Sequence, residues 1–265
     1  MSANGREEEH GPSDLVLAGR VVVVTGGASG IGLACAEACG QKGARIVLLS
    51  LPGRALDEAT ERLSSSGIDA RGMPADVRSF ASVTAAVDRV TGTVGAIDAV
   101  IASAGLADQS DLVSGDPDRW RDVLETNLLG AANTIRAVAP GMVASGAGDV
   151  VLIASLSGRD VYVGEPVYIA SKWGMVGLGH AARRELETSG VRVCLVEPGL
   201  VDTPLTRSST AVRRLLETGP SLTAEDVAAA VIWVLLRPRR VSVTELVIRP
   251  LGRGEIAFSA SDAQS

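Results

Sequence analysis

The sequence predicts an α/β fold, a single domain built on a doubly wound parallel sheet. Short runs rich in β-branched residues alternate along the chain with longer amphipathic segments. The short runs are apolar throughout, which is typical of strands that helices cover on both faces. The chain has 265 residues, 46% of them hydrophobic, which is enough for one large core and leaves no second domain to explain.

The clearest expected strands lie at residues 20–25, 45–50, 97–103, 149–155 and 191–197. Helices are expected over residues 31–41, 56–65, 80–91, 117–144, 167–188 and 224–236. The expected helix stops are Gly43, Gly67, Gly146 and Gly190. Glycine suits these positions because it adopts the left-handed conformation that closes a helix. In such a sheet, ligands bind beyond the carboxyl ends of the strands, where the strand order reverses.

The predicted domain covers residues 15–252 and includes a substrate loop at about residues 200–219. Residues 1–14 are polar and without periodicity, which predicts a flexible tail, and residues 253–265 form a C-terminal tail. The net charge of −6 argues against a nucleic-acid or anionic-membrane partner, because both require clustered Lys and Arg. No run of residues is apolar for the length of a membrane span.

Cysteine and histidine usage argues against a metal site. Cys35, Cys39 and Cys194 lack metal-ligand spacing, and the two histidines are isolated from one another. No segment near the N-terminus resembles a signal peptide. We therefore expect a cytoplasmic protein without a metal, whose partners are small molecules and other copies of itself.

A glycine-rich turn joins the first expected strand to the first expected helix, the context of a Rossmann-type dinucleotide site. Gly26 permits the tight turn, Gly30 lets the backbone approach a pyrophosphate, and Gly32 lets the helix pack close to the strand. The helix N-terminus offers free N–H donors to phosphate, and Ser29 and Ile31 belong to the same expected contact surface. An ordinary turn is the alternative, which the strand-turn-helix context makes the weaker one.

Tyr168 and Lys172 stand four residues apart, so they lie on one face of the helix expected over residues 167–188. A tyrosine that exchanges protons near neutral pH needs a lowered pKa, which the positive charge of Lys172 can supply. The alternative is a surface Tyr and a surface Lys on an amphipathic helix.

Together, the glycine spacing and the Tyr168/Lys172 pair resemble the classical short-chain dehydrogenase/reductase family, over about residues 17–250. Ser155, 13 positions before Tyr168, matches the family's catalytic serine, whose hydroxyl would hold the substrate oxygen. Asn127 matches the family's helix asparagine, which helps to hold a water leading to the lysine. A buried Asn that only satisfies backbone groups is the alternative for Asn127.

The resemblance implies further cofactor contacts at Asp76, Val77, Ala104, Gly105, Pro198, Gly199, Val201 and Thr203. Asp76 would contact the adenine, with a helix cap as the alternative role. Residues 102 and 103 stand where the family usually has two asparagines, so the bracing of that strand must come from elsewhere. Val201 and Thr203 would meet the nicotinamide carboxamide and its neighbouring phosphate.

Cofactor choice depends on the end of the second strand. Ser50 stands where NAD-preferring relatives commonly have Asp, so the acidic group that repels a 2′-phosphate is missing. Arg54 either reaches back to a 2′-phosphate or faces solvent. Residues 222–227 and 241–250 resemble a branch of NADP-dependent reductases. These observations favour NADP(H) by a small margin and leave NAD(H) as the alternative.

The resemblance implies an oxidoreductase that moves a hydride between nicotinamide C4 and a carbonyl or alcohol carbon, with Tyr168 as general acid and base. A non-enzymatic dinucleotide sensor or scaffold and an epimerase or dehydratase are the alternatives. The family also implies a homotetramer, with a homodimer as the alternative. In the expected substrate pocket, Val161, Val163 and Leu205 suggest apolar lining, and Arg159 either pairs with an anionic substrate or faces solvent.

Overall fold

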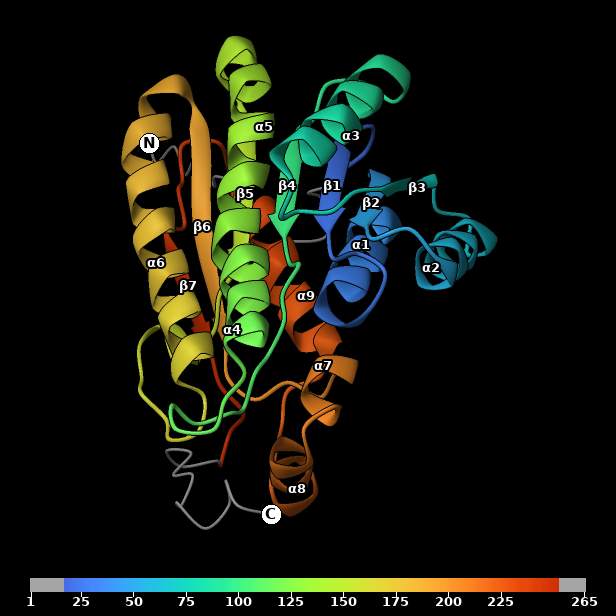
Figure 1. Cartoon of the computed structure of the whole chain (residues 1–265). Helices are drawn as coiled ribbons and strands as arrows, with labels where there is room; N and C mark the ends of the chain where they lie inside the picture. Colours follow the sequence, from blue (N-terminus) through green and yellow to red (C-terminus); the bar gives the residue numbers. More distant parts are fainter. Residues whose placement is uncertain (1–16, 253–265) are drawn as a thin grey trace, which may run out of the picture.

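A computed structural model describes residues 17–252 and confirms the doubly wound α/β fold (Figure 1). Seven parallel strands form one sheet in the order β3-β2-β1-β4-β5-β6-β7. The strands are β1 (Val21–Thr25), β2 (Arg45–Ser50), β3 (Ala70–Pro74), β4 (Ala99–Ala102), β5 (Gly148–Ile153), β6 (Val191–Pro198) and β7 (Glu245–Ile248). The strand order reverses between β1 and β4, which is where a ligand is expected. The expected tails at residues 1–14 and 253–265 lie outside the described residues.

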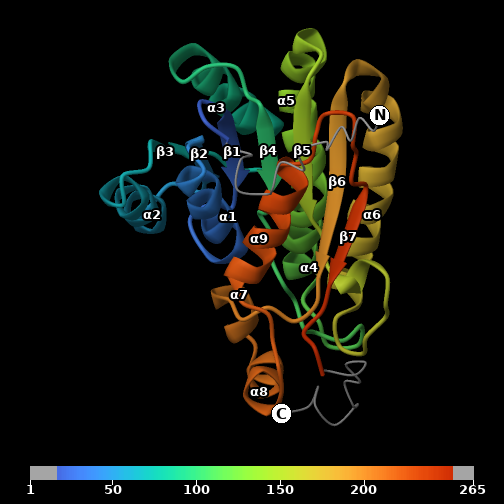
Figure 2. The ribbon, with the colours of Figure 1, turned by 180° about the vertical axis from the view of Figure 1, so that it is seen from behind.

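Helices cover both faces of the sheet. They are α1 (Gly30–Gln41), α2 (Arg54–Ser65), α3 (Phe80–Thr93), α4 (Pro117–Leu124), α5 (Gly130–Ser145), α6 (Pro166–Leu186), α7 (Pro204–Arg207), α8 (Thr210–Thr218) and α9 (Ala224–Leu235). In Figure 1, α3, α5 and α6 lie in front of the sheet, and Figure 2 shows α1 and α9 on the opposite face. The short helices α7 and α8 lie beyond one end of the sheet. None of the helices within residues 17–252 combines the length and apolarity needed to cross a bilayer.

The core consists of two apolar layers, one on each face of the sheet. Successive side chains of a strand point to opposite faces, so β1 contributes to both layers. Val22 and Val24 pack on the side of α1 and α9, whereas Val21 and Val23 pack on the side of α3 and α5. The continuous apolar character of β1 in the sequence therefore follows from its burial on both sides.

Several element boundaries differ from the sequence-based expectation. The helix expected over residues 117–144 is divided into α4, a π-helical segment (Glu125–Leu129) and α5. The expected substrate loop at residues 200–219 contains α7 and α8. The strands β3 and β7 escaped a firm assignment because they are short and only partly buried. The four predicted glycine stops at residues 43, 67, 146 and 190 are confirmed, since each adopts a positive φ of +70° to +87°.

Candidate active site

The glycine turn after β1 has room for hydrogen but not for larger side chains. A Cβ atom on Gly26, which has φ +65°, would lie 2.7 Å from the Cα atom of Ala104. A Cβ atom on Gly32 would lie 2.5 Å from the carbonyl oxygen of Gly26, so this glycine lets α1 pack against the turn. Ser29 precedes α1 in an extended conformation and its side chain makes no capping hydrogen bond. The N-terminus of α1 thus opens onto the space beyond the strands.

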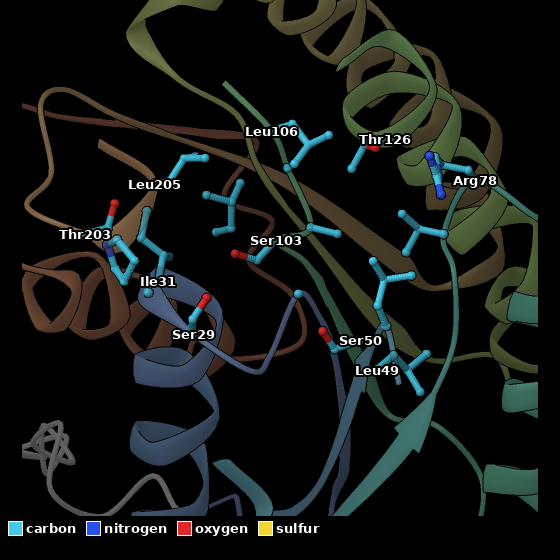
Figure 3. Close-up of a pocket in the computed structure, with 18 of the residues that line it drawn as sticks. Ser29, Ile31, Leu49, Ser50, Arg78, Ser103, Leu106, Thr126, Thr203 and Leu205 are labelled. Atoms are coloured by element: carbon cyan, nitrogen blue, oxygen red, sulfur yellow. The ribbon is translucent and has the colours of Figure 1, made fainter. Parts of the chain in front are cut away.

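A cleft of about 360 Å³ lies at this end of the sheet (Figure 3). The predicted cofactor contacts that line it are Gly26, Ser29, Gly30, Ile31, Ser50, Asp76, Val77, Ala104, Gly105, Tyr168, Lys172 and Thr203. In Figure 3, Ser50 and Arg78 lie on one side of the cleft, and Thr203 and Leu205 lie on the other. The sheet therefore brings together side chains from six separate segments of the sequence.

Four predicted cofactor contacts do not line this cleft. Gly32 packs against the glycine turn, and Val201 is buried and pairs with Leu222 through an isolated parallel bridge. Pro198 and Gly199 line a second cavity instead. The end of β6 thus contributes to the second cavity, whereas Thr203, four residues after Gly199, lines the cleft.

The second cavity has a volume of about 100 Å³ and adjoins the cleft, since Tyr168 and Leu205 line both. Ser155 also lines the second cavity. Ser155 lies two residues beyond the end of β5, where its hydroxyl accepts a hydrogen bond from the backbone N–H of Ser157 at 3.1 Å. The expected serine and tyrosine therefore share one cavity although they come from different elements.

The expected apolar lining of the substrate pocket is only partly correct. Leu205 lines the second cavity, as predicted. Val161 and Val163 do not, because they project to solvent with 76% and 58% of their surface exposed. Leu200, Val212 and Leu215 supply apolar lining in their place.

Of the two roles expected for Arg159, the structure supports the solvent-facing one, since 37% of its side chain is exposed, but its guanidinium is also paired with two carboxylates. Its guanidinium forms ion pairs with Glu197 and Glu245, and its Nη2 atom lies 2.9 Å from Oε1 of Glu197. Glu197 is fully buried on β6, so its carboxylate requires a charged partner. Arg159 is therefore occupied in the structure and does not line the second cavity. Glu245 also contacts His180, whose Nε2 atom lies 2.7 Å from Oε1 of Glu245.

Tyr168 and Lys172 lie one turn apart near the start of α6, as expected. The Lys172 Nζ atom lies 5.7 Å from the centre of the Tyr168 ring and donates a hydrogen bond to the carbonyl oxygen of Ile153 at 3.0 Å. Burial lowers the pKa of Lys172 to about 8. An ammonium group thus lies beside the tyrosine and is anchored to the end of β5.

The expected lowering of the Tyr168 pKa is not observed. Burial raises the pKa of the Tyr168 phenol well above its ordinary value, and the nearby Glu165 carboxylate raises it further. A side-chain hydrogen bond with Ser155 acts in the opposite direction without reversing the shift. The physical reason is that exclusion of water penalises the phenolate more than its polar neighbours compensate.

Asn127 joins three parts of the structure. It is completely buried in the π-helical segment, where its Nδ2 atom donates to the Leu106 carbonyl at 2.9 Å and to Oγ of Ser171 at 3.0 Å. Its Oδ1 atom accepts from the Leu106 N–H at 2.7 Å. Asn127 thereby supplies bracing for the segment after β4, together with Thr25, whose Oγ1 atom accepts from the Ala104 N–H at 3.4 Å. Its contact to Ser171 also connects it to the residue next to Lys172.

Two functional candidates escaped the sequence-based reasoning. Arg78 lines the cleft and makes a bidentate contact with Asp76, which lowers the pKa of that carboxyl. Its position directly after the Asp76-Val77 pair was the available signal. Glu165 lines the second cavity beside Tyr168, and the only hint was an isolated acid three positions before the tyrosine.

Arg54 does not line the cleft. Its side chain is 88% exposed and pairs with Glu58 at 2.6 Å on the outer surface of α2. Arg54 was expected either to reach back to a 2′-phosphate or to face solvent, and in the structure it faces solvent.

The three cysteines are free and buried. Burial raises the pKa of Cys39 and of Cys194 to about 12, so the reactive thiolate form is disfavoured. Within the described part of the chain, His, Cys, Asp and Glu form no group suited to a metal ion.

Comparison with known proteins gives a consistent result. Residues 20–214 match the model of the short chain dehydrogenase family. The chain is 34% identical over 236 residues to an uncharacterized oxidoreductase of Staphylococcus saprophyticus. This match covers 89% of the present chain and 99% of the relative. It is also 36% identical over 239 residues to the glycine betaine reductase of Emericella nidulans. That match covers 88% of the present chain but only 19% of the reductase, which is much longer.

A solved structure shows the same fold at comparable identity. The chain superimposes on a metagenomic short-chain oxidoreductase, solved in complex with NADP, with a TM-score of 0.77 and 29% identity. This match covers 89% of the present chain and 99% of the solved one.

Proposed function

This chain belongs to the short chain dehydrogenase family, and from that membership we propose that it transfers a hydride between C4 of a bound nicotinamide and a carbonyl or alcohol carbon of a small molecule. The observation that carries the proposal is the junction of the two cavities at Tyr168. A cofactor in the cleft and a substrate in the second cavity would meet at that side chain. Fold alone would not support this assignment, because one fold serves many functions.

The residues of the cleft fit a dinucleotide. Gly26 and Gly30 of the glycine turn line the cleft, and the N-terminus of α1 provides N–H donors and a positive dipole end for phosphate. Thr203 lies near Gly30 and would complete the phosphate-binding wall. When bound, the nicotinamide dinucleotide supplies or accepts the hydride.

The protein's own side chains would handle the proton. The raised pKa of Tyr168 keeps its phenol protonated near neutral pH, which is the form that donates a proton to a substrate oxygen. The hydroxyl of Ser155 would hold that oxygen in the same cavity. The ammonium of Lys172 would stabilise the phenolate left after proton transfer, since opposite charges favour the ionised form.

We favour NADP(H) as the cofactor. Ser50 at the end of β2 lines the cleft without a negative charge, and Arg78 adds a positive charge to the same side. Asp76 and Asp122 share this arginine through ion pairs. The missing repulsion at Ser50 therefore carries more of the preference than attraction by Arg78.

Replacement of Tyr168 tests the proposal. We expect Tyr168→Phe to reduce kcat/KM by about 10²- to 10⁴-fold while leaving dinucleotide affinity nearly unchanged, because only proton transfer is lost. Turnover is followed by cofactor absorbance with a panel of aldehydes, ketones and secondary alcohols, and cofactor affinity by calorimetry. Tyr162→Phe is the matched comparison, since Tyr162 is the chain's other tyrosine and lines the same cavity. Full activity of Tyr168→Phe would contradict the proposed acid–base role.

A further inference from the structure

Glu165 is a buried acid in the second cavity that the proposed chemistry does not use. It directly precedes Pro166 at the start of α6, and only 7% of its surface is exposed. Its carboxylate faces the same cavity as Tyr162 and Tyr168. Buried acids are rare unless they have a partner, so this position calls for a physical account.

The carboxylate is only half satisfied within the protein. The hydroxyl of Ser157 donates a hydrogen bond to Oε1 of Glu165 at 2.8 Å. Within residues 17–252, the second oxygen, Oε2, makes no hydrogen bond or ion pair with the protein. This oxygen is therefore available to a molecule that enters the cavity.

Among residues 17–252, no basic side chain lines the second cavity. Nearby cations are engaged elsewhere: Arg159 pairs with Glu197 and Glu245, and Arg249 pairs with Asp160 at 2.9 Å. In the part of the chain that the structure describes, Glu165 is thus the only carboxyl group that lines this cavity, and the other lining residues carry hydroxyl, amide or apolar side chains. The charge of this cavity favours a cationic guest and disfavours an anionic one.

We propose that Glu165 is a specificity-determining residue that selects substrates carrying an ammonium group close to the reacting carbonyl or alcohol. This inference rests on the proposed function, which puts the reacting oxygen between Ser155 and Tyr168. The cationic group then lies against Oε2 of Glu165, on the opposite side of the bound substrate. Burial raises the pKa of Glu165 to about 7, and a bound cation would favour its ionised form.

A pair of alcohols of the same shape tests the charge preference without turnover. Choline and 3,3-dimethylbutan-1-ol differ in whether a positive nitrogen or a neutral carbon carries the three methyl groups. Calorimetry on the full chain with NADPH, which cannot react with an alcohol, measures both affinities. We expect choline to bind about tenfold more tightly at pH 8, as a close charge pair in a partly buried site allows.

Three variants test whether Glu165 causes the preference for choline over the neutral alcohol. Glu165→Gln keeps the size and the Ser157 contact and should abolish the preference for choline, whereas Glu165→Asp should retain part of it. Glu185→Gln, at an exposed position at the far end of α6, removes the same charge and should retain the full preference. Equal binding of the two alcohols by the unmodified protein, or a preference that survives Glu165→Gln, would overturn the inference.

The pH dependence gives a further check. The preference for choline should rise between pH 6 and pH 8 as Glu165 ionises, since the other groups facing it, Tyr162 and Tyr168, stay protonated over this range. A preference that falls with rising pH would contradict the role of Glu165. Separately, failure to reduce both corresponding aldehydes would count against the proposed function, while the alcohol-binding comparison would still decide the charge preference.

Discussion

The burial of Glu165 predicts a pH-dependent loss of stability that Glu165→Gln should remove. Burial raises the pKa of this carboxyl from an ordinary value of 4.5 to about 7 in the folded protein. A group with a raised folded pKa contributes stability that is complete below its unfolded pKa and is lost as the pH rises through its folded pKa. The contribution of Glu165 to the free energy of unfolding therefore decreases as the pH rises from about 4.5 to about 7.

The magnitude follows from the size of the shift. One pKa unit corresponds to about 1.4 kcal/mol, so the shift of Glu165 is worth about 3 kcal/mol over the whole transition. Between pH 5 and pH 8, about 2.5 kcal/mol of this is lost. Glutamine carries no proton to lose, so Glu165→Gln should gain about that much stability relative to the unmodified protein over the same interval.

Urea unfolding at pH 5 and pH 8 measures the effect. The chain's three tryptophans provide a fluorescence signal, and linear extrapolation gives the free energy of unfolding. Both proteins are compared at one subunit concentration, because assembly changes apparent stability. Glu185→Gln, which alters an exposed acid, should show no pH-dependent gain. A difference between Glu165→Gln and the unmodified protein that is the same at both pH values would refute the reasoning.

Three further predictions concern the cofactor, a buried ion pair and assembly. Ser50→Asp should shift the ratio of kcat/KM values toward NAD(H) by about tenfold or more through like-charge repulsion of the 2′-phosphate, and a wild-type preference for NADH would overturn the proposed NADP(H) preference. Arg159→Met should lower the free energy of unfolding by about 3–5 kcal/mol, because it leaves the fully buried Glu197 without a counter-charge. Addition of Glu197→Leu should restore part of that loss in urea titrations, and no recovery would contradict the explanation. Light scattering should give the mass of a homotetramer, and a monomer at working concentration would rule out that assembly.

The sequence predicted those parts of the fold and site that depend on local pattern. The continuous apolar character of β1 indicated a strand buried on both faces, and the glycine turn indicated its sharp entry into α1. The four-residue spacing of Tyr168 and Lys172 was enough to put both on one face of α6. Such features are readable because backbone geometry repeats with a fixed period along the chain.

The element boundaries that the sequence did not predict share a different physical origin, namely contacts between distant parts of the chain. The helical periodicity of residues 117–144 gave no sign of the π-helical segment, because Asn127 is held there by Leu106 and Ser171 from distant parts of the chain. Likewise, the short strand β7 depends on pairing with β6, since its own burial is incomplete. Hydrogen bonds to remote partners decide these details, and local sequence does not encode them.

The sequence by itself determined the fold class, the glycine turn and the pairing of Tyr168 with Lys172. Only the tertiary structure decided that Arg159 neutralises Glu197 rather than facing a substrate, and that Glu165 lies buried beside Tyr168. It also decided the direction of the Tyr168 pKa shift, which depends on burial as well as on Lys172. The reason is that charge, burial and solvent exclusion at a side chain depend on all the elements packed around it, and these come together only when the chain folds.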